Sequence, residues 1–137
     1  MLFPKKVKHR KWQRLRGSEL GFSDRGSDVS FGSYGLKAVE SGQVPAKQIE
    51  AGRKAISRYV QKGGKMWIRI FPDRPKTEKP PEVGMGAGKG DPTGYFALVH
   101  AGRVIFEIDG LNEEDAHEAL RKAGAKIGLK TKFVKRK

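Results

Sequence analysis

The sequence predicts an α+β fold: a mixed or antiparallel sheet with two helices, basic extended terminal arms and a long Gly/Pro-rich loop. Two segments have the apolar spacing of amphipathic helices, and the strand-like segments around them do not follow regular βαβ repetition. Hydrophobic residues make up 36% of the 137 residues, which suffices for one small core. We therefore expect a basic arm over residues 1–17 and a single domain over residues 18–137, which contains the loop 72–94 and a basic tail over 130–137.

The first half of the chain is expected to form strands and then a helix. A Gly/Ser/Asp-rich loop over 17–32 should enter a short strand near 28–31, and alternating apolar residues predict another strand over 34–40. Residues 46–62 should form the first helix, because Pro45 suits a helix start, apolar residues recur at helical spacing and glycines follow.

The second half should begin with a strand over 65–71, which Pro72 ends. The proline- and glycine-rich run up to Gly94 predicts an unstructured loop, followed by strands over 95–100 and 103–109 that form a hairpin around Ala101-Gly102. Asn112 should cap the second helix, since three acidic residues follow it and an apolar stripe continues to Ala123. A last strand is expected over 129–134.

The charge distribution indicates an acidic partner. The formal net charge is +14 and the isoelectric point is about 10.2, an excess that repels itself unless a polyanion neutralises it. Acid-free basic runs occupy residues 5–16 and 130–137, and Trp12 lies within the first of them. Such runs are also typical of solvated tails, but arginines that can bind phosphate and a tryptophan that can stack favour RNA.

The predicted first helix carries a basic face as well. Its cations are Lys47, Arg53, Lys54, Arg58 and Lys62, and Glu50 is the acid beside them. An ordinary solvated surface mixes both signs, so this stripe fits a phosphate-binding face better, although the solvated-surface interpretation stays open. No helix-turn-helix pattern accompanies it, which favours RNA over DNA.

The stretch GMGAGKG, residues 84–90, resembles a phosphate-binding loop but fits neither nucleotide template. The P-loop pattern would need glycine in place of Val83 and a hydroxyl residue in place of Gly90. The dinucleotide pattern would need glycine where Lys89 or Asp91 stands. Its glycines instead permit close approach of the backbone to another molecule.

Catalytic constellations are not evident in the sequence. There is no cysteine, the three histidines are scattered, and the acids that cluster are explained by capping of the second helix. No apolar run approaches the roughly 18 residues of a membrane span. We therefore expect no enzyme, no metal, no cofactor and no membrane partner.

Several strings together resemble one family over nearly the whole chain. They are MLFPKKVKHRK, GSDVSFGSYGLKAVE, QIEAGRKAISRYVQKGGKMWIRIFPDRP, KPPEVGMGAGKG, GRVIFEIDG and LKTKFVKRK. In this order they are similar to the bacterial-type large-subunit ribosomal protein family L sixteen. The most specific element is GGKMWIRIFPDRP followed by the Met-Gly-x-Gly-Lys-Gly loop.

The resemblance implies a structural protein of the large ribosomal subunit that binds its rRNA and helps organise the aminoacyl-tRNA site. It also implies contact with A-site tRNA, with P-site tRNA as a further candidate. Neighbouring ribosomal proteins would be partners, and no homo-oligomer is expected. The implied location is the cytoplasmic ribosome, and an organelle ribosome of bacterial type stays open. Hypotheses from other classes are a free-standing RNA chaperone or tRNA-binding factor and, from the glycine loop alone, a nucleotide-dependent enzyme.

Site residues follow from the charge pattern and the resemblance together. The expected rRNA contacts are Lys5, Lys6, Lys8, Arg10, Lys11, Trp12, Arg14, Arg16, Arg53, Lys54, Arg58, Lys62, Arg69, Lys132, Lys135 and Arg136. The loop expected to face tRNA and rRNA supplies Lys76, Lys79, Gly84, Met85, Gly86, Gly88, Lys89 and Gly90. The family commonly has RMGKGKG at the loop, so Gly84 and Ala87 replace two cations, and the arginine that some members hydroxylate is missing.

Overall fold

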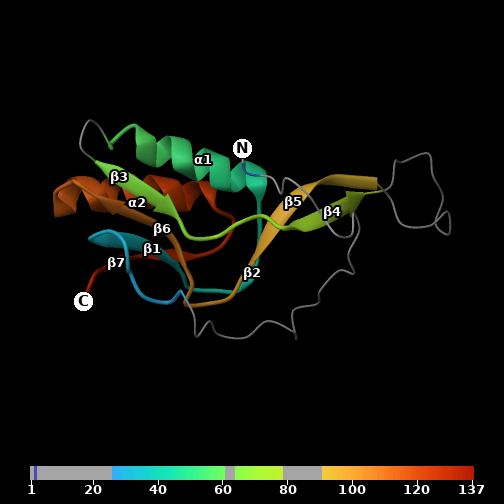
Figure 1. The fold of residues 1–137 in the computed structure, drawn as a ribbon, viewed down its shortest axis with the longest axis horizontal. Coiled ribbons are helices and arrows are strands. Elements are labelled where there is room, and N and C mark those ends of the chain that lie inside the picture. Colours follow the sequence, from blue (N-terminus) through green and yellow to red (C-terminus); the bar gives the residue numbers. More distant parts are fainter. Residues whose placement is uncertain (1, 3–25, 61–63, 79–90) are drawn as a thin grey trace.

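The computed structural model describes Leu2 and residues 26–60, 64–78 and 91–137, which form two antiparallel sheets and two helices (Figure 1). One sheet has the order β3-β6-β1-β7, from β3 (Lys65–Ile68), β6 (Val104–Asp109), β1 (Tyr34–Ala38) and β7 (Thr131–Lys135). The other has the order β2-β5-β4, from β2 (Gly42–Pro45), β5 (Asp91–Val99) and β4 (Arg74–Glu78). The α+β class is confirmed, with two sheets where the sequence predicted one.

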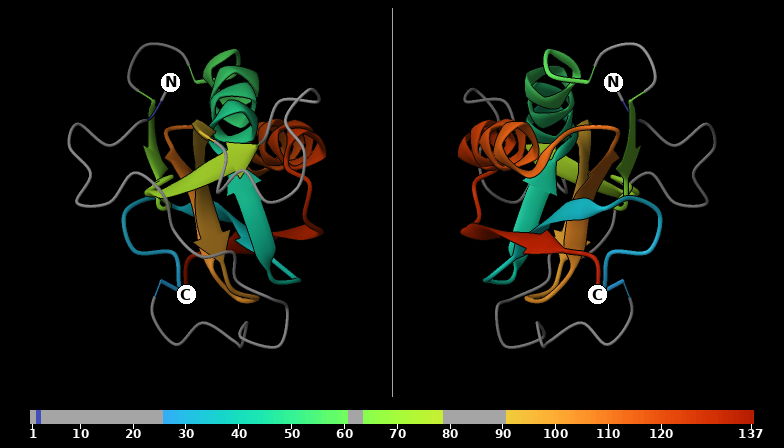
Figure 2. Two further views of the ribbon diagram at one scale, coloured as in Figure 1. Left: turned by 90° about the vertical axis from the view of Figure 1, so that its right-hand side faces the viewer. Right: turned by 90° about the vertical axis from the view of Figure 1, so that its left-hand side faces the viewer.

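The helices α1 (Ala46–Ser57) and α2 (Glu113–Lys126) lie side by side on one face of the four-stranded sheet (Figure 2). Between them and the sheet, Ile49, Ile56, Leu120 and Phe106 are fully buried. The close fit requires Gly52 on α1, because a Cβ there would stand 2.9 Å from the Phe106 ring. The core therefore fixes where both helices present their outer faces.

The helix starts follow from local chemistry. The Asn112 side chain accepts a hydrogen bond of 2.8 Å from the Asp115 N–H, so the predicted cap of α2 is confirmed. Pro45 precedes α1 without a side-chain cap and also closes β2, a strand that the sequence did not predict. The helix α1 ends at Ser57, before the predicted end at residue 62.

The predicted hairpin between the strands at 95–100 and 103–109 is wrong. β5 pairs with β2 and β4, whereas β6 pairs with β1 and β3. The turn between them is bound to β1 instead: Gly102, at φ 95°, donates to the Ala38 carbonyl at 2.8 Å, and the Ala38 N–H donates to the Arg103 carbonyl at 2.8 Å. These bonds direct the two strands into different sheets.

Part of the predicted loop 72–94 is also a strand pair. β4 and the first half of β5 form an arm that extends from the body of the protein (Figure 1). Pro75 is tolerated because β4 is an edge strand, and Pro92 because residues 91–95 pair with β4 alone. The described arm ends at Glu78 and Asp91, which pair with each other.

The predicted strand near 28–31 is absent; this stretch has no strand assignment. Residues 26–33 lie over the face of the four-stranded sheet opposite the helices, in light blue in Figure 1. Val29 is buried there, and a Cβ on Gly35 would stand 2.9 Å from the Val29 side chain. We call residues 26–33 the covering segment.

Candidate nucleic-acid interface

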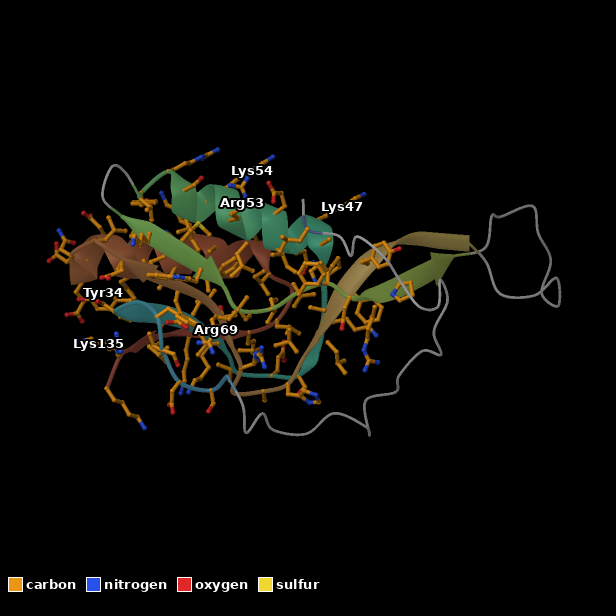
Figure 3. The ribbon with its side chains drawn as sticks, in the orientation of Figure 1. Tyr34, Lys47, Arg53, Lys54, Arg69 and Lys135 are labelled. Carbon is orange, nitrogen blue, oxygen red and sulfur yellow. The ribbon has the colours of Figure 1, made fainter. Side chains whose placement is uncertain are left out.

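The outer face of α1 carries a row of exposed cations. Lys47, Lys54 and Arg58 recur at spacings of seven and four residues and therefore share one side of the helix. In Figure 3, Lys47 and Lys54 extend from α1 away from the sheets. Among the residues that the structure describes, no acid forms an ion pair with these three side chains.

Arg53 differs from its neighbours because its guanidinium is engaged with Glu50. Nε donates to one carboxylate oxygen at 3.1 Å and Nη2 to the other at 2.5 Å. The hydrogen bond from Arg53 lowers the pKa of Glu50 below its ordinary value, and the carboxylate in turn raises the pKa of Arg53. The pair is locally neutral, so Arg53 adds less positive field than the other three cations.

The end of β7 contributes a second basic group. Lys132 and Arg136 are exposed, and Lys135, labelled in Figure 3, forms an ion pair with Glu113 at the start of α2. That carboxylate raises the pKa of Lys135. Lys132 lies directly opposite Lys37 of β1 in the antiparallel register.

Arg69 holds the fold together. Its guanidinium forms an ion pair with Glu107, donates to the Asp28 carbonyl at 3.2 Å and stands 4.9 Å from the centroid of the Phe31 ring. The side chain is only 16% exposed. These contacts give Arg69 a structural role, and its guanidinium is not directed at solvent as the cations of α1 are.

Glu107 is a buried carboxylate at the centre of this network. Its Oε1 atom accepts hydrogen bonds from the backbone N–H groups of Ser30, Phe31 and Gly32 at 2.9, 2.7 and 2.9 Å. Three consecutive N–H groups directed at one anion cannot belong to a regular strand, whose N–H groups alternate in direction, which explains why 28–31 is not one. Burial raises the pKa of Glu107, but the N–H donors and Arg69 outweigh it, so the pKa ends below the ordinary value.

The remaining predicted site residues are Lys76 and a group that lies outside the described residues. Lys76 belongs to β4, in the arm, whereas the sequence placed it in a loop. The N-terminal cations from Lys5 to Arg16, with Trp12, and Lys62, Lys79 and the glycine-rich stretch 84–90 lie outside the described residues.

Two features of the described residues were not found from the sequence. One is the Glu107 network, whose signal was a lone acid in the centre of the apolar strand VIFEID. The other is the contact of Phe31 with Trp67, which are distant in the sequence and stack with ring centroids 6.1 Å apart.

The described part of the chain lacks two other kinds of feature. No three His, Cys, Asp or Glu side chains gather there in a way that could hold a metal ion. Neither α1 nor α2 has the length and apolar character that a membrane crossing requires.

Comparison with known proteins gives the family. Residues 4–134 match the model of the family described as ribosomal protein L16p/L10e. The chain is 54% identical over 136 residues to the large ribosomal subunit protein uL16 of Xanthomonas oryzae pv. oryzae, a match that covers 99% of this chain and 98% of that protein. The uL16 protein of Alkalilimnicola ehrlichii matches with the same identity and coverage.

These matches set aside the hypotheses of a free-standing RNA chaperone and of a nucleotide-dependent enzyme, because the family consists of structural ribosomal proteins. The chain belongs to the ribosomal protein L16p/L10e family and is a structural constituent of the large ribosomal subunit.

Proposed function

We propose that the chain binds large-subunit rRNA through the outer face of α1 and the end of β7, and that the arm β4–β5 directs the glycine-rich stretch 84–90 toward tRNA in the aminoacyl site. The observation that carries the proposal is the row Lys47, Lys54 and Arg58, for which the described residues offer no acidic ion-pair partner. Three such cations on one helix face suit a polyanionic backbone better than a mixed protein surface would.

The two basic groups would act by neutralising phosphates. Lysine and arginine that replace condensed counterions release them into solution, and this release favours binding at low salt. Such contacts position an RNA without reading its sequence. Because α1 and β7 are both packed on the same core, their cations would bind RNA segments at fixed distances from each other.

The arm supports the tRNA part of the proposal. Glu78 and Asp91 pair at its end, so the stretch 79–90 starts and finishes at one place on the molecule. Lys89 is the one charged residue in GMGAGKG, and the glycines around it allow a backbone to approach closely. The loop proposed to face A-site and P-site tRNA would therefore combine one phosphate contact with a close fit.

The rRNA contact is tested by the triple variant Lys47→Gln, Lys54→Gln and Arg58→Gln. We expect the slope of log affinity against log salt to fall by roughly 2–3, because three phosphate contacts are lost. Filter binding of the full chain to protein-free large-subunit rRNA across a range of potassium chloride concentrations measures this slope.

A matched control removes the same charge from the other helix. Arg121→Gln, Lys122→Gln and Lys126→Gln also deletes three cations, but Arg121 and Lys122 form ion pairs with Glu118 on α2. The control should change the slope less than the α1 variant. Equal slopes for the two triple variants would refute a specific role for α1.

The tRNA contact is tested by Lys89→Ala in reconstituted large subunits. Loss of one charge-assisted hydrogen bond should weaken A-site tRNA binding by roughly 10-fold, while incorporation of the protein into subunits stays at the parental level. Quantitative tRNA binding to purified ribosomes measures the first quantity and gradient sedimentation the second. Unchanged tRNA affinity would count against the loop contact while leaving the rRNA contact intact.

A further inference from the structure

Two aromatic side chains, the exposed Phe31 and the partly buried Trp67, lie on the side of the four-stranded sheet opposite the helices. Phe31 of the covering segment is 55% exposed, more than any other large hydrophobic side chain that the structure describes. Its ring stacks on Trp67 of β3 with an interplanar angle of 24° and a centroid distance of 6.1 Å. We call Phe31 and Trp67 the aromatic platform.

The platform is held rigidly from below. The Phe31 N–H donates to Glu107 at 2.7 Å, and the Arg69 guanidinium stands over the ring. Arg69 is itself held by Glu107 and by the Asp28 carbonyl. Trp67 is opposite Glu107 in the register of β3 and β6, so these two side chains are neighbours on one face of the sheet. A preorganised surface loses little conformational entropy when a ligand binds.

The same face of the four-stranded sheet carries several cations. Lys37 and Lys132 are direct cross-strand partners, an arrangement of like charges that destabilises a sheet and that a bound anion would relieve. A hollow beside the covering segment is lined by Lys37, Lys135, Arg136 and Lys137, and Asp28 is the one acid among its lining residues. Lys65, two residues before Trp67, projects from the same side of β3, where Asp109 of β6 is its cross-strand partner.

We propose that the aromatic platform is a binding site for an unpaired RNA base, whose flanking phosphates contact Lys37 and Lys132. This inference rests on the proposed rRNA binding and names one of its subsites. Stacking suits the exposed Phe31 ring because every base has a π-face, and the like-charged lysine pair favours an anionic ligand over a hydrophobic protein surface. The ligand is therefore an RNA segment with an unstacked base.

The first experiment compares two phenylalanine substitutions. Phe31→Leu keeps an apolar side chain but removes the aromatic face, and we expect it to weaken binding to protein-free large-subunit rRNA by roughly 5- to 100-fold. The salt slope should stay at the parental value, because no phosphate contact is lost. Phe71→Leu is the control: Phe71 is 47% exposed, but no ring contact with Trp67 is found for it. Both variants should unfold at the parental urea concentration.

The second experiment observes the platform directly. In a Trp12→Phe background, Trp67 is the single tryptophan of the chain. An oligouridine should quench its fluorescence, and an abasic ribose-phosphate oligomer of the same length should not. Quenching by both oligomers would overturn stacking, because the abasic chain carries the charge without the base.

The outcomes separate the platform from the proposed function. Parental affinity of Phe31→Leu for rRNA, with strong and salt-dependent binding by the wild type, overturns the platform and leaves rRNA binding standing. Weak or salt-independent binding by the wild type overturns the proposed rRNA binding itself. Parental rRNA affinity combined with poor incorporation of Phe31→Leu into subunits would assign the rings to a protein neighbour and also overturn the base site.

Discussion

Glu107→Ala is expected to lower the free energy of unfolding of the free protein by about 3–5 kcal/mol. The substitution removes the acceptor of the Ser30, Phe31 and Gly32 N–H groups and leaves Arg69, whose side chain is 16% exposed, without its carboxylate partner. The large expected loss arises because a buried donor or charge that loses its partner keeps its desolvation penalty. Urea denaturation followed by circular dichroism measures the change.

An exposed ion pair provides the matched control. Glu118 pairs with Arg121 and Lys122 on α2, and Glu118→Ala should destabilise the protein far less, because solvent screens exposed pairs. Acid titration adds a second check. The pKa of Glu107 lies below its ordinary value of 4.5, so its contribution is present above pH 4.5 and is lost as the pH falls through the lower value in the folded protein. Glu107→Gln should therefore show a weaker acid dependence than the wild type. Two results would contradict the network: equal urea midpoints for Glu107→Ala and Glu118→Ala, and the same loss of stability in acid for Glu107→Gln and the wild type.

Gly32→Ala is expected to destabilise the free protein by about 2–3 kcal/mol. A Cβ at this position would stand 2.4 Å from the Ile108 carbonyl oxygen and 2.8 Å from its carbon, both backbone atoms of β6. The covering segment would have to move away from the sheet. This movement would also lengthen the hydrogen bond of 2.9 Å that the Gly32 N–H donates to Glu107. Thermal unfolding with a calorimetric enthalpy reports the loss.

Gly94→Ala in β5 is the control for that substitution. A Cβ there meets no atom within 4 Å, and Gly94 does not have a positive φ, so the effect should be close to zero. A Gly32→Ala protein as stable as Gly94→Ala would show that the covering segment tolerates displacement.

Features controlled by neighbouring residues could be predicted from the sequence. Asn112 and the acids after it define the start of α2, because capping depends on residues within one helical turn. The strands β1, β3 and β7 were predicted with errors only at their ends. β2 was missed because its sequence, GQVP, offers one large apolar residue, Val44, and no alternation.

Features that depend on distant partners could not be predicted. The turn at Ala101-Gly102 has the local pattern of a hairpin, but Ala38 occupies its hydrogen-bonding groups. Arg69 is a residue type that commonly contacts phosphate. Its charge is neutralised by Glu107 on a neighbouring strand, which only the fold shows. The neutralisation of Arg53 is a different case, because its partner Glu50 is only three residues away.

The strand β5 works mechanically as a cantilever. Its end over residues 96–99 is fixed by β2, and its free end over residues 91–95 is braced by β4 alone, so the two supports overlap only at Phe96. The direction of the arm is therefore set at one junction, Phe96, which is next to Ala97 and close to Val99 in the core. A small repacking of the core at this junction would displace the far end of the arm by a larger distance. The direction of the arm is therefore determined by packing in the interior of the protein.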